Sequence, residues 1–471
     1  MKFFLFCLST LFFIGCSSVD LQTFNEAYYG GNMKKAYDIA HKGANLPQEN
    51  QKHKSKSDDL LWQVQGGIAG FYGDIDESRQ MLLTADRMMQ DAIKNFAIIF
   101  FGNLGAVLTS DNVLPYPIYL YEASMVNYYL ALDSMNQGKD QDARVYLNQA
   151  LQRQNDAKFY YAREIEKSQE SLNNMKNVSS EAPKTDQYVA VTMDFARESE
   201  RDREVQDEKK YINPIIPYLK FIFELKRQNF SAIASMSADD FALFPLEDKE
   251  ILESRKSGDT KRYIWVIIED GKSASKGTLS FSIPLPMNPE VFLNPAMLAI
   301  ALSSKEGALF TAVASNSILL NYVEPKVLEG ISFAKSYSFE NKEIPEFFVL
   351  SDLMKTEFDT RIAGVRTRAI LRSIPPAIGA FISERAGNEA GFNGLGLLFS
   401  LGHKLILRAD TRIITALPHS FYVTRMENTK DKKKILVDGR DLIEFQTKDQ
   451  SQDAIVYIRN LGSSFFIKVF E

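Results

Sequence analysis

The sequence predicts an α+β multidomain protein in which an all-α region of helical repeats precedes a mixed α+β region. Between residues 20 and 234, apolar residues recur at spacings of three and four with few prolines, which is a helical pattern. After Gly258 they alternate, as in Leu279, Phe281 and Ile283, which is typical of strands. An apolar content of 45% over 471 residues is enough for two or three cores. We therefore expect a helical domain at residues 24–234 and an α+β domain at 255–471.

The first residues follow the plan of a lipoprotein signal. Lys2 precedes an apolar stretch at residues 3–14, which is shorter than the ~20 residues that span a bilayer. Gly15 and Cys16 stand where that stretch stops, and together they resemble a bacterial lipobox, with Phe13 where leucine is usual. We expect a signal peptide at 1–15 and a lipidated tether at 16–23. The alternative is an ordinary secretion signal that ends on a chance cysteine.

Lipidation of Cys16 places the chain in the cell envelope. Two or three acyl chains hold a protein firmly to a membrane. Ser17, rather than aspartate, follows the cysteine, which predicts sorting to the outer membrane, with the protein facing the periplasm. The other cysteine, Cys7, lies within the signal, so the mature chain forms no disulfide. The net charge of −5 and the absence of a concentrated basic region argue against nucleic acid as a partner.

A ladder of small residues repeats in the helical region. Gly73 is followed by Ser78, Leu82 and Ala85, and the same offsets recur after Gly31 and Gly138. With Trp62 and Gly66 on the preceding helix, this set resembles the tetratricopeptide repeat, in which small residues let paired helices cross closely. The spacing between these glycines is uneven, so the pattern predicts an irregular array. A plain helical bundle is the alternative.

Stacked helix pairs leave a concave face that binds extended or helical peptides. The helices before Gly73 and Gly138 would contribute that face, with Gln63, Gln65, Tyr128 and Tyr129 as the candidate groove residues. The alternative is that the tyrosines belong to the core.

A charged stretch follows the repeats. Residues 158–210 lose large apolar side chains in places, which predicts a charged linker made of a solvated helix with a loose joint at 178–185, and only seldom a binding tail. A new apolar helix at 213–225 ends the helical domain. We expect residues 258–471 to fold on their own.

The second half is predicted from its alternating segments. Strands are expected at residues 262–271, 277–285, 414–426, 433–447 and 453–470, with turns at Asp438-Gly439 and near Gly462. One helix interrupts them: Ser351 or Asp352 caps it, and Pro375 kinks or ends it.

Four segments, 108–132, 213–225, 347–374 and 409–426, resemble successive blocks of an uncharacterised family of proteobacterial outer-membrane lipoproteins. Family members have a tetratricopeptide-like N-terminal half and are often encoded near a lipoprotein that activates penicillin-binding proteins. The resemblance covers residues 60–426. It implies envelope proteins as partners, among them the peptidoglycan-synthesis machinery or other outer-membrane lipoproteins. It supplies no catalytic residue.

The residues do not predict an enzyme. His41, His53, His403 and His419 stand outside any zinc-binding pattern, and no serine lies in a G-x-S-x-G elbow. The glycine-rich stretch from Gly391 lacks the P-loop lysine. Glu269-Asp270 precedes Gly271 and favours a hairpin turn over acid–base chemistry. We expect no cofactor and no metal.

One helix carries a possible basic stripe. Arg361, Arg368 and Arg372 fall within about 40° of one another on a helix, and Glu357 lies one turn before Arg361. The stripe predicts either a docking surface for an anionic partner or a solvated face with internal ion pairs.

These patterns together favour a non-enzymatic scaffold or adaptor, anchored by lipid, that binds other envelope proteins. The alternatives are a surface-exposed or structural lipoprotein and a cryptic hydrolase that acts on envelope polymers.

Overall fold

The computed structural model describes residues 20–44, 58–101, 115–174, 208–286, 317–373 and 407–471, together with Ala380, Ser400 and residues 403–404. The signal peptide, Cys16, His53, the joint at 178–185, the glycine-rich stretch from Gly391 and Pro375 lie outside the described residues. Within the described residues, no helix is both long enough and apolar enough to cross a membrane.

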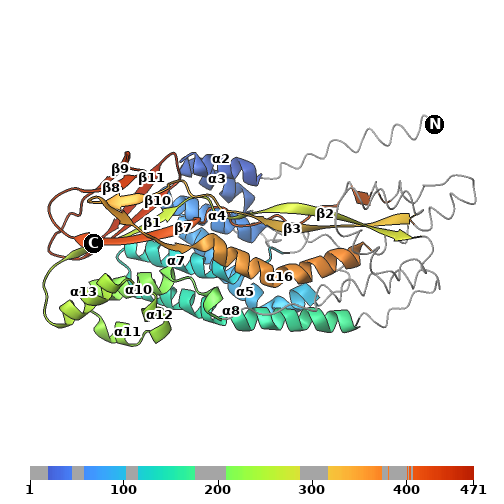
Figure 1. The fold of residues 1–471 in the computed structure, drawn as a ribbon, viewed down its shortest axis with the longest axis horizontal. Helices are drawn as coiled ribbons and strands as arrows, with labels where there is room; N and C mark the ends of the chain where they lie inside the picture. The colour runs from blue at the N-terminus through green and yellow to red at the C-terminus, as the bar shows by residue number, and fades with distance from the viewer. Residues whose placement is uncertain are drawn as a thin grey trace, which may run out of the picture.

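Helices form the first half of the described chain (Figure 1). They are α2 (Leu21–Tyr29), α3 (Met33–Gly43), α4 (Asp59–Tyr72), α5 (Ser78–Phe101), α7 (Leu120–Asn136), α8 (Asp140–Asn174), α10 (Ile215–Lys226), α11 (Phe230–Ala234), α12 (Ala238–Ala242) and α13 (Leu246–Lys256), with a 3-10 turn, η4, at Glu208–Tyr211. The side chains of Asp20 and Asn32 cap α2 and α3 by accepting hydrogen bonds from backbone N–H groups. Consecutive helices pack against one another, α3 on α4, α4 on α5 and α7 on α8.

Small residues make these helix contacts close. A Cβ atom added at Gly66 would lie 2.5 Å from the side chain of Met81 and 3.1 Å from that of Ala40. Ala85 and Ala150, which belong to the sequence ladder, are fully buried. Bulky substitutions at Gly66 would therefore force neighbouring helices apart.

The strands are β1 (Tyr263–Asp270), β2 (Ser275–Pro286), β3 (Ser317–Leu328), β4 (Tyr337–Phe339), β5 (Lys342–Ile344), β6 (Glu346–Val349), β7 (Ser420–Glu427), β8 (Lys433–Val437), β9 (Asp441–Phe445), β10 (Ala454–Asn460) and β11 (Phe465–Phe470). Five of them form a sheet in the order β11-β10-β1-β7-β6, and four form a second sheet in the order β5-β4-β8-β9. β1 is parallel to β10 and antiparallel to β7. β2 and β3 form a separate ribbon.

The five-stranded sheet is buried on both faces. From β1, Trp265 and Ile267 join the core formed with the helices, whereas Ile264 and Val266 join a core formed with the four-stranded sheet. A strand covered on both faces reads as a continuous apolar run, and this explains the sequence of β1. The molecule is thus layered as helices, sheet and sheet, and its main core combines residues from both predicted domains. The mixed α+β class is confirmed.

One long helix, α16 (Leu350–Arg372), lies beside β3 and runs away from the sheet alongside the β2–β3 ribbon (Figure 1). The helix was predicted, but its cap was not. Val349 occupies the N-cap position without a side-chain bond, and the Ser351 hydroxyl instead bonds His419.

Three other sequence predictions need correction. Residues 158–174 are helical as predicted, as part of α8, but the helix is not solvated on every face, because Tyr161 and Glu164 are buried. Glu269 and Asp270 end β1 and are fully buried, and the backbone turns only at Gly271, where φ is +81°. The strand predicted at 414–426 begins at Ser420.

Candidate functional site

The predicted peptide groove is not open, because this chain itself covers it. Gln63, Gln65, Tyr128 and Tyr129 are all buried, with exposures of 1% or less. The Gln65 amide donates to Thr415 Oγ1 at 2.7 Å and accepts from the Ala416 N–H at 2.8 Å. A segment that precedes β7 therefore bonds to α4 at the place where a partner peptide was expected.

The two tyrosines of that groove belong to the core. Tyr129 donates to Glu269 of β1 at 2.8 Å, and the Tyr128 ring lies against Phe421 and Tyr457 from the sheet. The sequence alone does not distinguish a side chain that packs against another layer of the fold from one that contacts a ligand, since both kinds are large and partly polar. These residues are withdrawn as ligand contacts.

The first residue of the basic stripe on α16, Arg361, does not lie on the surface. Arg361 is buried, its Nε lies 3.0 Å from Glu164 of α8, and its Nη1 donates to the Ile118 carbonyl at 2.8 Å. Arg368 and Arg372 are half-buried. Glu357, the predicted partner of Arg361, instead accepts from the Tyr121 N–H and the Tyr161 hydroxyl. Arg361 and Glu357 thus tie α16 to α8 and to the start of α7.

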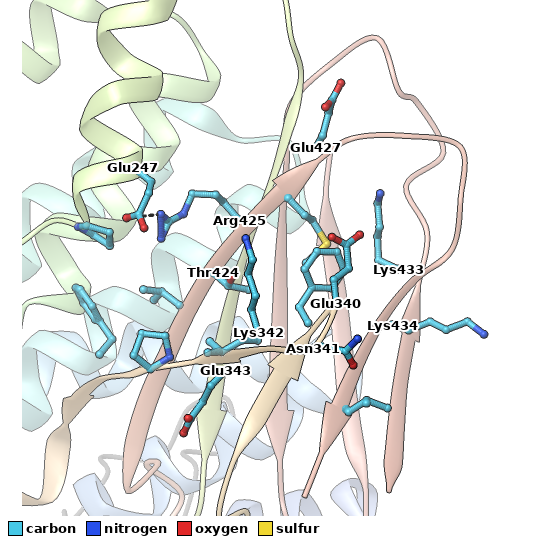
Figure 2. A pocket seen from close by; sticks show the side chains of 18 of the residues that line it. Glu247, Glu340, Asn341, Lys342, Glu343, Thr424, Arg425, Glu427, Lys433 and Lys434 are labelled. Atoms are coloured by element: carbon cyan, nitrogen blue, oxygen red, sulfur yellow. Dashed lines mark ion pairs between the residues drawn. The ribbon is translucent and has the colours of Figure 1, made fainter. Parts of the chain in front are cut away.

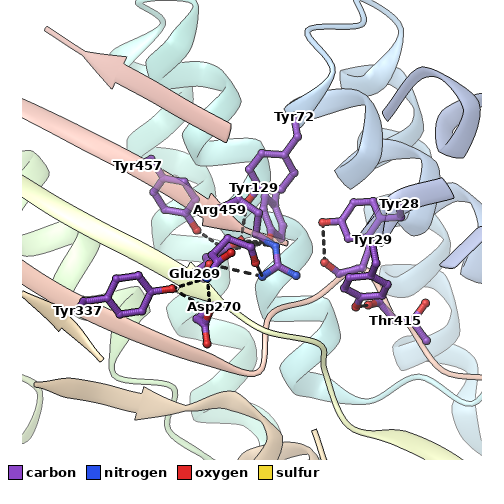
Figure 3. Close-up of polar contacts among 12 residues, drawn as sticks. Tyr28, Tyr29, Tyr72, Tyr129, Glu269, Asp270, Tyr337, Thr415, Tyr457 and Arg459 are labelled. Atoms are coloured by element: carbon purple, nitrogen blue, oxygen red, sulfur yellow. Dashed lines mark hydrogen bonds and ion pairs between the residues drawn. The ribbon is translucent and has the colours of Figure 1, made fainter. Parts of the chain in front are cut away.

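A buried cluster of polar groups surrounds Glu269 (Figure 3). Three tyrosine hydroxyls donate to its carboxylate: Tyr72 of α4, Tyr129 of α7 and Tyr457 of β10. The Arg459 guanidinium stands on the same side, with its Nε 3.6 Å from Oε2. Burial raises the pKa of Glu269, an effect that Arg459 opposes.

Asp270 makes a second, adjoining set of bonds. Its carboxylate accepts from the Tyr337 hydroxyl and the Asn460 amide, each at 2.8 Å, and from the Phe333 N–H at 3.1 Å (Figure 3). Glu269 and Asp270 therefore point to different layers from neighbouring positions of β1. Because both side chains are fully buried, a substrate in solution does not reach them, and the bonds that they accept join helices to strands.

A serine–histidine pair lies near the start of α16. The Ser351 Oγ and the His419 Nδ1 are 2.8 Å apart, and the hydroxyl also accepts from the Ala274 N–H at 3.2 Å. A catalytic serine needs an oriented histidine and an accessible hydroxyl. Ser351 is 6% exposed, and in the described part of the chain no carboxylate bonds the imidazole. The hydrogen bond between Ser351 and His419 joins the start of α16 to the residue that precedes β7.

Two further buried carboxyl groups lie on helices, Glu122 on α7 and Glu357 on α16. Burial raises the pKa of Glu122 to about 7 and that of Glu357 to about 8. Glu122 accepts from the Tyr116 hydroxyl at 2.7 Å, and Glu357 accepts from the Tyr121 N–H at 3.0 Å. Tyrosine and backbone donors thus satisfy both groups.

These two groups make folding stability depend on pH. In the unfolded chain they ionise near 4.5, whereas in the folded protein they keep their protons to about pH 7 and 8. Between these values the folded state binds more protons, so its stability must fall as the pH rises. We expect the melting temperature to decrease from pH 5 to pH 8. Calorimetry should show a smaller decrease in the double variant Glu122→Gln/Glu357→Gln, and a melting temperature that rises over this range would contradict the assignment.

A large cleft opens between the end of β7 and the four-stranded sheet (Figure 2). Its volume is about 1050 Å³, at the upper end of the range for ligand pockets. Val423 to Glu427 of β7 form one wall, with Pro245 and Glu247 beside them, and the β4–β5 hairpin and the start of β8 form the other. The cleft was not predicted from the sequence. The three consecutive lysines at 432–434 are the feature of the sequence that could have indicated it.

Both walls of the cleft carry charged side chains. On the wall formed by the β4–β5 hairpin and β8, exposed Lys342 and Lys432 lie among the carboxylates Glu340, Glu343 and Asp431, whereas Lys433 is buried and donates to Thr429 at 2.7 Å. The opposite wall carries Glu247 and Glu427, with Arg425 held by Glu247 at 2.9 Å (Figure 2). The cleft therefore presents groups of both charges on each wall.

No cluster of histidine, cysteine and carboxylate side chains in the described ranges could hold a metal ion. Comparison with protein-family models, curated proteins and solved structures finds no significant match. The resemblance to the lipoprotein family stays a prediction from the sequence segments named above.

Proposed function

We propose that this chain is a lipid-anchored, non-enzymatic scaffold of the outer membrane that binds a segment of another envelope protein in the cleft beside β7. Cys16 provides the anchor, and the protein faces the periplasm. The observation that carries the proposal is the cleft itself: it is large, it is open to solvent, and exposed side chains of both charges line it.

The positions of the acidic groups favour binding over catalysis. Glu269, Asp270, Glu122 and Glu357 are buried with satisfied bonds, whereas a general acid or base must contact its substrate. The exposed carboxylates Glu340 and Glu343 lie on the β4–β5 hairpin beside Lys342. Such a surface suits recognition of a charged chain segment.

We also propose that the helices from α3 to α8 form an irregular tetratricopeptide-like array. The small residues of the sequence ladder are buried where consecutive helices meet, which supports this. In this proposal the array holds the sheet in place, with its concave face covered by this chain's own residues.

A photoreactive phenylalanine analogue placed at Glu343 should crosslink to a second envelope protein in intact cells. Glu343 is exposed and lines the cleft, so a bound segment would lie within reach of the probe. The same analogue at Lys35, exposed on α3, should give no such product. Gel electrophoresis and mass spectrometry of the product would identify the partner.

Charge reversal should then remove the product. Lys342→Glu/Lys432→Glu changes the cleft, and Lys35→Glu/Lys42→Glu makes the same charge change on exposed α3. We expect at least a tenfold loss of product in the first variant and none in the second, at unchanged melting temperature. Cys16→Ser, which removes the acylated thiol, controls for anchoring. A product that survives the cleft variant would locate binding elsewhere.

A further inference from the structure

One edge of β7 lacks a strand partner over part of its length, and this edge determines how the cleft would bind a partner segment. β7 is paired with β1 along its whole length, but on its other side β6 contacts only Ser420 to Tyr422. Pro345, which has no N–H group, lies between β5 and β6. β6 therefore begins only at Glu346, and β5, which precedes it, belongs to the other sheet. From Val423 to Glu427, β7 therefore has no strand partner on this side among the described residues.

The backbone groups on that side can be assigned from the β1–β7 register. The Asn428 N–H bonds to the Arg262 carbonyl at 2.7 Å, so residues 428, 426 and 424 direct their N–H and C=O groups toward β1. Alternation then directs those of Val423, Arg425 and Glu427 away from β1. Of these residues Arg425 and Glu427 are open to the cleft, whereas Val423 is 3% exposed. An unpaired edge of this kind is a template for another extended chain.

We infer that the cleft binds its partner by strand addition: an extended segment of another protein pairs with Val423 to Glu427 and continues the line of β6. This inference rests on the proposed function and specifies its mode. A five-residue strand is about 17 Å long, which matches the unpaired length of β7.

The charges of the two walls specify the side chains of that segment. Residues opposite Thr424 and Met426 would face the four-stranded sheet, because Met426 packs in the core with that sheet. There exposed Lys342 and Lys432 lie among Glu340 and Glu343, so acidic and basic side chains both find a partner of opposite charge. Residues opposite Arg425 and Glu427 would face the other wall, where Glu247 is paired with Arg425 and the exposed Glu427 favours a basic residue. The inferred partner is therefore an extended segment that carries both acidic and basic residues.

Competing occupants of the same edge give different outcomes. A second copy of this chain could supply a strand, in which case the protein would dimerise through the cleft. A folded surface that contacts only the side chains would not need the free N–H groups of β7. The test below distinguishes these from an extended segment.

Glu427→Pro and Glu427→Ala form a matched pair of variants. Both remove the exposed carboxylate, but only proline removes the N–H that points into the cleft, and the bonds to β1 stay intact. The probe is a random library of twelve-residue peptides displayed on phage, selected on the full chain carrying Cys16→Ser. Enriched peptides are then synthesised and their affinity is measured by fluorescence anisotropy.

We expect enriched peptides to carry both acidic and basic residues, to bind the alanine variant, and to bind the proline variant at least about tenfold more weakly. Peptide binding should also slow hydrogen exchange at the Arg425 and Glu427 amides, a readout that needs no variant. Equal binding to both variants without such protection would overturn strand addition and leave the proposed function standing. A library that yields no binding peptide would overturn the inferred segment. So would a wild-type protein that is dimeric and becomes monomeric in the Glu427→Pro variant. By contrast, the proposed function would be overturned if the probe at Glu343 formed no crosslink in cells, or if the crosslink survived charge reversal in the cleft.

Discussion

Replacement of Arg459 by methionine should lower the free energy of unfolding by about 3–5 kcal/mol. The guanidinium is fully buried beside Glu269, and its Nη1 donates to the Asn460 carbonyl at 3.2 Å. Methionine fills similar space but leaves the carboxylate without its nearby cation. Urea denaturation would measure the loss. Arg440→Met, at an exposed position, is the control and should cost little.

A double-mutant cycle would separate the pair from its surroundings. In Glu269→Gln one of the two acceptor oxygens becomes an NH2 donor, so at least one tyrosine hydroxyl must accept instead of donating, and Arg459 loses its counter-charge. We expect Glu269→Gln/Arg459→Met to be clearly more stable than the sum of the single losses predicts, because removing both charges leaves neither one unpaired in the core. Additive losses would show that the two groups do not interact.

The fragment of residues 258–471 should not fold alone, contrary to the sequence-based expectation. Its sheet would expose the side chains that pack on the helices, which are Trp265, Ile267, Phe421, Val423, Ile455 and Tyr457. Burial of a large apolar side chain contributes about 1.5–3 kcal/mol, so their exposure would cost about 9–18 kcal/mol. This is comparable with the whole stability of a typical domain, about 5–15 kcal/mol.

The measurement is circular dichroism with thermal unfolding of the purified fragment. We expect no cooperative transition, and co-expression with residues 16–257 should restore one. A monomeric fragment that melts cooperatively would show instead that the two halves are separate folding units. Glu269 supplies an independent check, since its donors Tyr72 and Tyr129 would be absent from the fragment.

Local pattern was enough to predict most of the elements. A continuous apolar run located β1, alternation located β2, and Asp438-Gly439 correctly marked the turn between β8 and β9. The short strands β4, β5 and β6 were missed, because three or four residues give too little alternation to read.

Side-chain environment was harder to predict than backbone structure. Glu269 and Asp270 look like a turn because two acidic residues precede a glycine, and only distant residues such as Tyr129 and Tyr337 reveal their buried partners. Gln65 and Tyr128 were expected to contact a partner, and the contact that they make is with this chain's own later residues. The cleft depends on where β6 ends relative to β7, which no local sequence pattern encodes.

The parallel pairing of β1 with β10 has a consequence for synthesis of the protein. Ile264 pairs with Ala454, so β1 is translated 190 residues before this neighbour and long before β7. At ~5–20 residues per second, one of the most apolar strands waits for roughly 10–40 s with both edges unpaired. Such a strand aggregates readily. The five-stranded sheet can therefore be completed only after β10, near the end of the chain, has been made.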